Sequence, residues 1–202
     1  MYTSLGSVSL KRGEAVEVGV VRGPDLEWAE RVEGLLGHKG PIWQRQNAAA
    51  VCRECRDLGI EANFYLLHRD GKPLANIATF THRGVGHFGH VWTVPEDRRQ
   101  GAASQLMGVQ MAHFRQEGGR ALFLGTGYDS APYHIYASHG FVGLEPKSGQ
   151  MEYYSQTRAE FEEEYFAKGA VQVEEVQWRH WPASAALFLG EFPGAVRCAP
   201  LK

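Results

Sequence analysis

The chain has 202 residues, a length that suits one well-packed domain. Charged residues make up 22% of it and the formal net charge is −2, which excludes a protein with the broad basic surface of a nucleic-acid binder. The sequence holds no run of about 18 apolar residues that would cross a membrane, and we identify no signal peptide at its start.

The first half of the chain predicts strands and helices around one hairpin. Residues 15–21 alternate between apolar and polar and then become apolar, which is typical of a strand. Asp70-Gly71 separates two apolar runs, which indicates a tight hairpin turn. The expected elements are a strand at 15–21, helices at 26–36 and 43–57, hairpin strands at 62–67 and 74–81, and a strand at 87–94.

The second half alternates between helices and strands. Such an alternation predicts a single α/β domain in which helices cover a mixed central sheet. We assign residues 1–155 to this domain and 156–202 to a C-terminal extension packed on it. The expected elements are helices at 106–114 and 131–139, strands at 121–124, 141–144 and 150–154, and an acidic helix at 160–166.

The most informative segment is the turn after the strand at 87–94. A polar loop leads into a helix that begins at three small residues, Gly101, Ala102 and Ala103. The first N–H groups of a helix have no internal partner, and the helix dipole adds roughly half a positive charge there. A diphosphate fits such a site, and small side chains let its oxygens approach the amides.

This turn resembles the central acetyl-CoA motif of the GNAT superfamily of N-acetyltransferases, R/Q-x-x-G-x-G/A. Arg98, Gly101 and Ala103 occupy its three fixed positions. The resemblance implies the GNAT fold, acetyl-CoA as co-substrate without a metal, and a strand that pairs with the pantetheine arm. The residues it assigns are Arg99, Gln100, Gly101, Ala102, Ala103 and Ser104 for the pyrophosphate, and Trp92, Thr93 and Val94 for the pantetheine arm.

A second segment, residues 129–141, resembles the N-x-x-A-x-x-L-Y-x-x-x-G-F helix of the same family. Tyr136 keeps the family position, and the resemblance implies that it protonates the leaving thiolate. An unperturbed tyrosine, with a pKa of about 10, carries the proton that this role requires. Tyr133 lies three residues earlier and is the alternative. Asp129 stands where many members have asparagine, which implies a contact to the pantetheine arm or the substrate.

The residue that accepts a proton from the attacking amine is left open among three candidates. These are His87, His90 and Glu61, and we favour His90 because it lies just before the proposed cofactor strand. His87 and His90 are three residues apart on a strand, so we expect them to point to opposite faces and not to share a metal.

We also expect no metal at the cysteines. Cys52 and Cys55 lack the second pair of ligands that a structural zinc site needs. The odd number of cysteines, three, together with the missing secretion signal, favours a cytoplasmic protein with reduced thiols.

Together the two resemblances imply an N-acetyltransferase that moves an acetyl group from acetyl-CoA to a primary amine by direct transfer in a ternary complex. The acceptor is a small-molecule or peptide amine, and we expect neither nucleic acid nor a membrane as partner. Two alternatives stay open: an enzyme of the same fold that uses another acyl group or decarboxylates, and a non-catalytic acyl-CoA-binding module. The aromatic residues at 178–182 either pack on the sheet edge, form a homodimer contact or line the acceptor pocket, and we favour packing.

Overall fold

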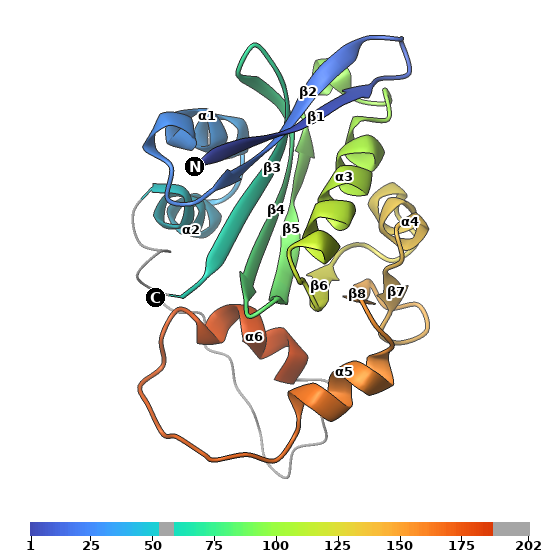
Figure 1. The fold of residues 1–202 in the computed structure, drawn as a ribbon. Helices are drawn as coiled ribbons and strands as arrows, with labels where there is room; N and C mark the ends of the chain where they lie inside the picture. The colour runs from blue at the N-terminus through green and yellow to red at the C-terminus, as the bar shows by residue number, and fades with distance from the viewer. Residues whose placement is uncertain (53–58, 188–202) are drawn as a thin grey trace.

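The computed structural model describes residues 1–52 and 59–187. Its centre is an eight-stranded sheet with the strand order β1-β2-β3-β4-β5-β6-β8-β7 (Figure 1). Neighbouring strands are antiparallel except β5 and β6, which are parallel. The strands are β1 (Tyr2–Ser9), β2 (Ala15–Arg22), β3 (Glu61–Arg69), β4 (Lys72–His82), β5 (Val85–Thr93), β6 (Ala121–Gly125), β7 (Val142–Gly143) and β8 (Gln150–Tyr154).

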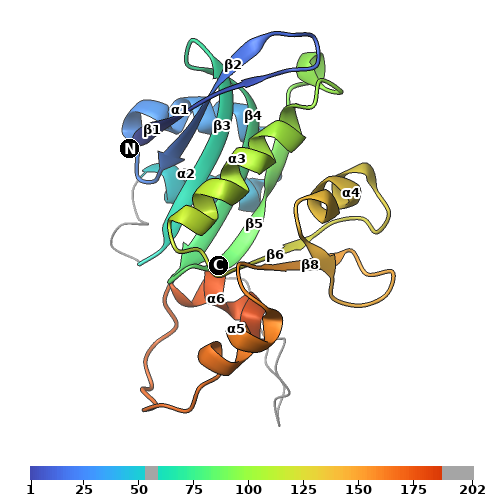
Figure 2. The same ribbon diagram turned by 45° about the vertical axis from the view of Figure 1, so that its right-hand side comes forward.

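Helices cover both faces of the sheet, which confirms the predicted fold class. Figures 1 and 2 show α1 and α2 on one face and α3 on the other. Asp25 caps the start of α1 by accepting hydrogen bonds from the amides of Glu27 and Trp28. The helices are α1 (Leu26–Leu36), α2 (Pro41–Cys52), α3 (Ala102–Gln116), α4 (Ala131–Ser138), α5 (Arg158–Tyr165) and α6 (His180–Leu187), with a short 3-10 helix, η1, at Pro95–Asp97.

The central strands are apolar on both sides because each face has its own core. On β3, Phe64 and Leu66 pack toward α1 and α2, whereas Tyr65 and Leu67 pack toward α3. Strands that are covered on both faces lose the apolar–polar alternation of a half-exposed strand. This explains why the sequence shows continuous apolar runs here.

Three parts of the predicted element order need correction. β1 was not expected, because only its pairing with β2 makes it a strand and most of its residues are exposed. The strand expected at 141–144 is limited to Val142–Gly143, and α6 was not expected as a helix. The part of the expected second helix beyond Cys52 lies outside the described residues.

Helix α6 lies against the lower end of β4 and β5 (Figure 1). The ring of Trp181 is 5.2 Å from that of Phe80 on β4 and 5.2 Å from that of His87 on β5. Ala186 of the same helix is fully buried against Val85 and Phe161. Within residues 1–52 and 59–187, no helix has the length and apolar character needed to span a membrane.

Candidate active site

The sheet opens between its two parallel strands. β5 and β6 pair only from Val85–His87 to Ala121–Phe123. Beyond that point β6 and β8 turn away from β5 toward α4 (Figure 2). The later part of β5 therefore has one edge without a neighbouring strand in the described structure, and an extended ligand can approach its backbone there.

The three residues expected to contact the pantetheine arm differ in whether their backbone groups are already hydrogen-bonded within the chain. Trp92 and Thr93 are the last residues paired with β4. The Val94 amide donates to the carbonyl of Leu74 at 2.9 Å, and the Val94 carbonyl accepts from the amide of Asp97 at 3.1 Å. Both backbone groups of Val94 are thus occupied within the chain. Because hydrogen-bonded pairs alternate along an antiparallel ladder, Trp92 faces β4 as Val94 does, and Thr93 faces the open edge. The Thr93 carbonyl accepts a hydrogen bond from Arg98, which leaves the Thr93 amide as the candidate.

An apolar cavity of about 90 Å³ lies at this opening. It brings the two sequence motifs together, because Ala103 comes from the first and Tyr136 from the second. The complete lining is Ile77, Val91, Ala103, Met107, Pro132, Ile135 and Tyr136.

Tyr136 is the tyrosine that the structure places at the cavity. Its side chain is buried, with the ring 5.3 Å from that of Phe88. No hydrogen bond of its hydroxyl is found to any described residue, and burial raises its pKa to about 12. Tyr133 instead packs against Tyr128 at 5.4 Å and does not line the cavity.

The turn before α3 presents a row of backbone amides. Gly101 caps the helix with φ 82°, and the first bond inside the helix runs from the Gln105 amide to the Gly101 carbonyl at 2.9 Å. Arg99 is also in the left-handed region, with φ 61°. In the described ranges, the amides of residues 99–104 donate no backbone hydrogen bond outside the regular pattern of α3. The predicted pyrophosphate amides are therefore available to an anion.

This turn is anchored by a charged network that the sequence did not reveal. Asp97 is buried and accepts two hydrogen bonds from Arg69 at 2.8 Å each and one from Arg12 at 2.8 Å. Glu14 bridges the same two arginines. The hydrogen bonds from Arg69 lower the pKa of Asp97, so the network keeps its charges at neutral pH. Since the partners come from three distant parts of the chain, only the fold brings them together.

Three other residues of the predicted site have different neighbours. The Arg98 guanidinium lies 4.5 Å from the Trp92 ring, and its Nε donates to the Thr93 carbonyl. Ser104 Oγ is 3.2 Å from Nε2 of His139, the residue that caps the C-terminal end of α4. Asp129 is exposed and its Oδ1 lies 2.9 Å from His134 Nε2, so it does not line the cavity.

His90 lies in a bulge of β5, on the face of the sheet opposite the apolar cavity. The register shifts between Asn76 and Ala78 of β4, and His90 adopts φ 51° there. The Asn76 side-chain amide donates to the His90 carbonyl at 2.9 Å and supports this conformation. The His90 ring is 5.5 Å from Trp43 of α2 and 5.8 Å from Phe80.

The bulge overturns the prediction that His87 and His90 point to opposite faces. Both rings pack on the face that carries Phe80 and Trp181. An inserted residue breaks the alternation of side chains along a strand, which the simple period of two did not anticipate.

The three candidate proton acceptors have different surroundings. Desolvation, followed by the neighbouring Lys39 and His38, lowers the pKa of His90 to about 4, so its ring is neutral at pH 7. His87 is covered by α6, where its Nε2 is 3.3 Å from the Trp181 carbonyl oxygen. Glu61 is exposed at the start of β3 and accepts a hydrogen bond from the Thr81 hydroxyl at 2.9 Å.

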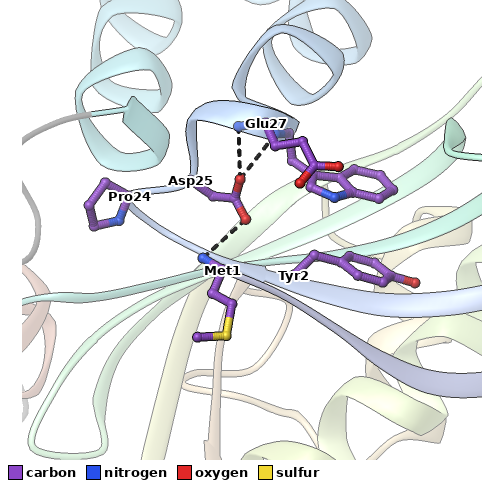
Figure 3. A pocket seen from close by; sticks show the side chains of 6 residues that line it. Met1, Tyr2, Pro24, Asp25 and Glu27 are labelled. Atoms are coloured by element: carbon purple, nitrogen blue, oxygen red, sulfur yellow. Dashed lines mark hydrogen bonds and ion pairs between the residues drawn. The ribbon is translucent and has the colours of Figure 1, made fainter.

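A second, shallow depression lies beside the N-terminus (Figure 3). There the Met1 amine is 3.1 Å from the Asp25 carboxylate, and Tyr2 stacks on Trp28. The depression contains no residue of either motif. The described residues also include no group of three His, Cys, Asp or Glu side chains arranged as metal ligands, and Cys55 lies outside them.

Comparison with known proteins gives a consistent result. Residues 21–134 match the family described as an acetyltransferase (GNAT) domain. No curated protein is similar enough in sequence to count as a relative.

Solved structures show the same fold at low sequence identity. The GNAT domain of the S. lividans protein PAT covers 74% of this chain and 96% of its own, with 13% identity and a TM-score of 0.53. GCN5 of Tetrahymena covers 68% and 94%, with 9% identity and a TM-score of 0.51. The ribosomal-protein-S18-alanine N-acetyltransferase of Escherichia coli covers 67% and 89%, with 14% identity and a TM-score of 0.50.

Proposed function

Because this chain belongs to the GNAT acetyltransferase family and is an acyltransferase, we propose that it transfers an acetyl group from acetyl-CoA to a primary amine. The observation that carries this proposal is the row of free amides at residues 99–104, next to the opening between β5 and β6. The transfer is direct, within a ternary complex of enzyme, acetyl-CoA and amine.

The cofactor side of the site lies on the α3 face. The amides of residues 99–104 bind the pyrophosphate, and Gly101 lets it approach because this residue has no side chain of its own. The pantetheine arm pairs with the free edge of β5 at the Thr93 amide. This arrangement directs the thioester toward the apolar cavity that Tyr136 lines.

Tyr136 acts as the general acid. The amine attacks the thioester carbonyl, and the tetrahedral intermediate then collapses by breaking the carbon–sulfur bond. The hydroxyl of Tyr136 gives its proton to the departing sulfur and regains one from solvent. Support comes from its buried position at the cavity, its lack of a hydrogen-bond partner among described residues and its raised pKa, which keeps it protonated.

The acceptor side lies on the opposite face, where α1 and α2 pack. His90 is neutral and has a ring nitrogen lone pair that can accept a hydrogen bond from the amine. A base with a pKa of about 4 holds a proton only briefly, so we propose that His90 orients the neutral amine and relays its proton to solvent. The aromatic rings of Trp43 and Trp92 border this region, and His38 stacks on Trp92 at 3.7 Å.

The test is a panel of small-molecule and peptide amines assayed for thiol release from acetyl-CoA, with longer acyl-CoAs in parallel. We expect amine-dependent thiol release and a product that carries the acetyl group. Faster turnover with a longer acyl-CoA would replace acetyl by that group. CoA binding without turnover for any amine would favour the non-catalytic module.

A further inference from the structure

The turn between β1 and β2 is fixed against the proposed pyrophosphate loop (Figure 1). Its backbone is held by the Lys11 amide, which donates to the Gln100 carbonyl at 3.0 Å. Leu10 is 2% exposed in the core beneath α3, and its amide donates to the Glu14 carbonyl at 2.8 Å. The position of the Lys11 backbone is therefore set by the loop itself.

The side chain of Lys11 extends beside Gly101. Its Cγ and Cε lie 3.7 and 3.8 Å from the point that a Cβ on Gly101 would occupy. The next residue of the turn, Arg12, is already bound to Asp97 and Glu14. Lys11, by contrast, is exposed, and no ion pair or hydrogen bond of its ammonium is found in the described part of the chain.

We propose that Lys11 binds the diphosphate of the acyl-CoA, as a cation supplied from the N-terminal hairpin about 90 positions before the loop. The inference rests on the proposed function, since it needs the diphosphate at residues 99–104. The amides contribute only partial charges, whereas a lysine ammonium contributes a full one and binds phosphate as a point charge. The Lys11 hydrogen bond to Gln100 then couples the hairpin to the occupied loop.

The first test measures CoA binding by calorimetry for wild type, Lys11→Ala, Lys11→Arg and the control Lys168→Ala. Lys168 is exposed in the C-terminal extension, beyond α5. We expect Lys11→Ala to weaken CoA binding by about tenfold, the effect of one charged hydrogen bond. Lys11→Arg keeps the charge, so its dissociation constant for CoA is expected to stay within about threefold of the wild-type value. The same is expected of the control Lys168→Ala. Equal melting temperatures exclude a folding defect.

The second test varies the acyl donor. With acetyl-3′-dephospho-CoA, which keeps the diphosphate, Lys11→Ala should raise KM as much as with acetyl-CoA. With S-acetyl-pantetheine, which lacks the diphosphate, the variant and wild type should agree. Loss of the effect with the dephospho donor would assign Lys11 to the 3′-phosphate and overturn the proposal, and so would a persisting effect with acetyl-pantetheine. Wild type that binds no CoA would refute the proposed function itself, whereas normal binding by Lys11→Ala refutes only this inference.

Discussion

At the scale of single residues, burial shifts the pKa values of Tyr136 and His90, on opposite sides of the sheet, in opposite directions. Burial disfavours the charged form of each, so it raises the pKa of the phenol and lowers that of the imidazole. Both side chains are therefore neutral at pH 7. The phenol keeps a proton to donate, and the imidazole keeps a lone pair to accept one.

Replacing Tyr136 by phenylalanine tests the proton donor. We expect Tyr136→Phe to lower kcat by on the order of 100-fold, the lower end of general-acid effects. KM for acetyl-CoA should change little, because the hydroxyl makes no hydrogen bond to a described residue. Steady-state kinetics measures both, with Tyr133→Phe as the matched control on the same helix. Unchanged kcat in Tyr136→Phe would remove the residue from the mechanism.

His90 predicts a pH-dependent contribution to stability. Its pKa is about 4 in the folded protein and about 6.5 when unfolded, so the unfolded chain binds the proton more readily. The stabilisation is fully present above pH 6.5 and is lost as the pH falls toward 4. Between pH 7 and pH 5, this residue should lower the free energy of unfolding by about 2 kcal/mol.

Urea unfolding of wild type and His90→Gln at both pH values measures this difference. Wild type should lose more stability than the variant over the interval. Parallel losses in the two proteins would mean that the His90 ring titrates normally.

At the scale of elements, β5 combines a bulge, an open edge and a close approach to β4. Gly86 pairs with Thr81 of β4, and a Cβ on Gly86 would meet the Phe80 carbonyl oxygen at 1.9 Å. At Gly89, three residues later in the same strand, a Cβ would meet nothing within 4 Å. The strand thus has no room for a side chain at Gly86, whereas it has room for one at Gly89.

This difference gives a paired test of the strand geometry. Gly86→Ala forces the backbones of β4 and β5 apart, and we expect it to lower the free energy of unfolding by roughly 3 kcal/mol or more. Gly89→Ala should change it by less than about 1 kcal/mol. Denaturant titration compares the two variants, and equal effects would contradict the close approach.

The sequence predicted some elements of this site well and others not at all. The turn at Gly101 and the Tyr136 helix follow from local patterns, because helix starts and small residues are encoded within a few positions. The bulge at His90 has no such local pattern, since it depends on the register with β4. The contacts of Arg69 and Lys11 with the loop were missed for the same reason: both residues belong to other strands or turns, and only the sheet order places them there.

At the scale of the whole molecule, the C-terminal extension is joined to the sheet through α6. The Trp181 ring contacts Phe80 of β4 and His87 of β5. We propose that this packing makes residues 156–187 part of the same folding unit as the domain. The exposed segment at 169–177 connects α5 to this contact, and its Glu174 forms ion pairs with Arg179 and His180 beside the start of α6.

Truncation of Trp181 tests whether residues 156–187 unfold together with the domain. Trp181→Ala should lower the melting temperature clearly, with a loss of about 2 kcal/mol, somewhat less than a fully buried aromatic residue because Trp181 is partly buried. Trp43, 49% exposed on α2, is the control, and Trp43→Ala should lose less than half as much. A two-step transition in calorimetry, or no change in Trp181→Ala, would show that the extension folds independently.

The most direct measurement of the central claim is calorimetric titration of the purified protein with CoA and acetyl-CoA, alongside Gly101→Glu. We predict that wild type binds one equivalent of either ligand. The Gly101→Glu protein should bind none, because its side chain fills the anion site and repels the diphosphate. Absence of binding by wild type, or equal binding by Gly101→Glu, would contradict a diphosphate site at the start of α3.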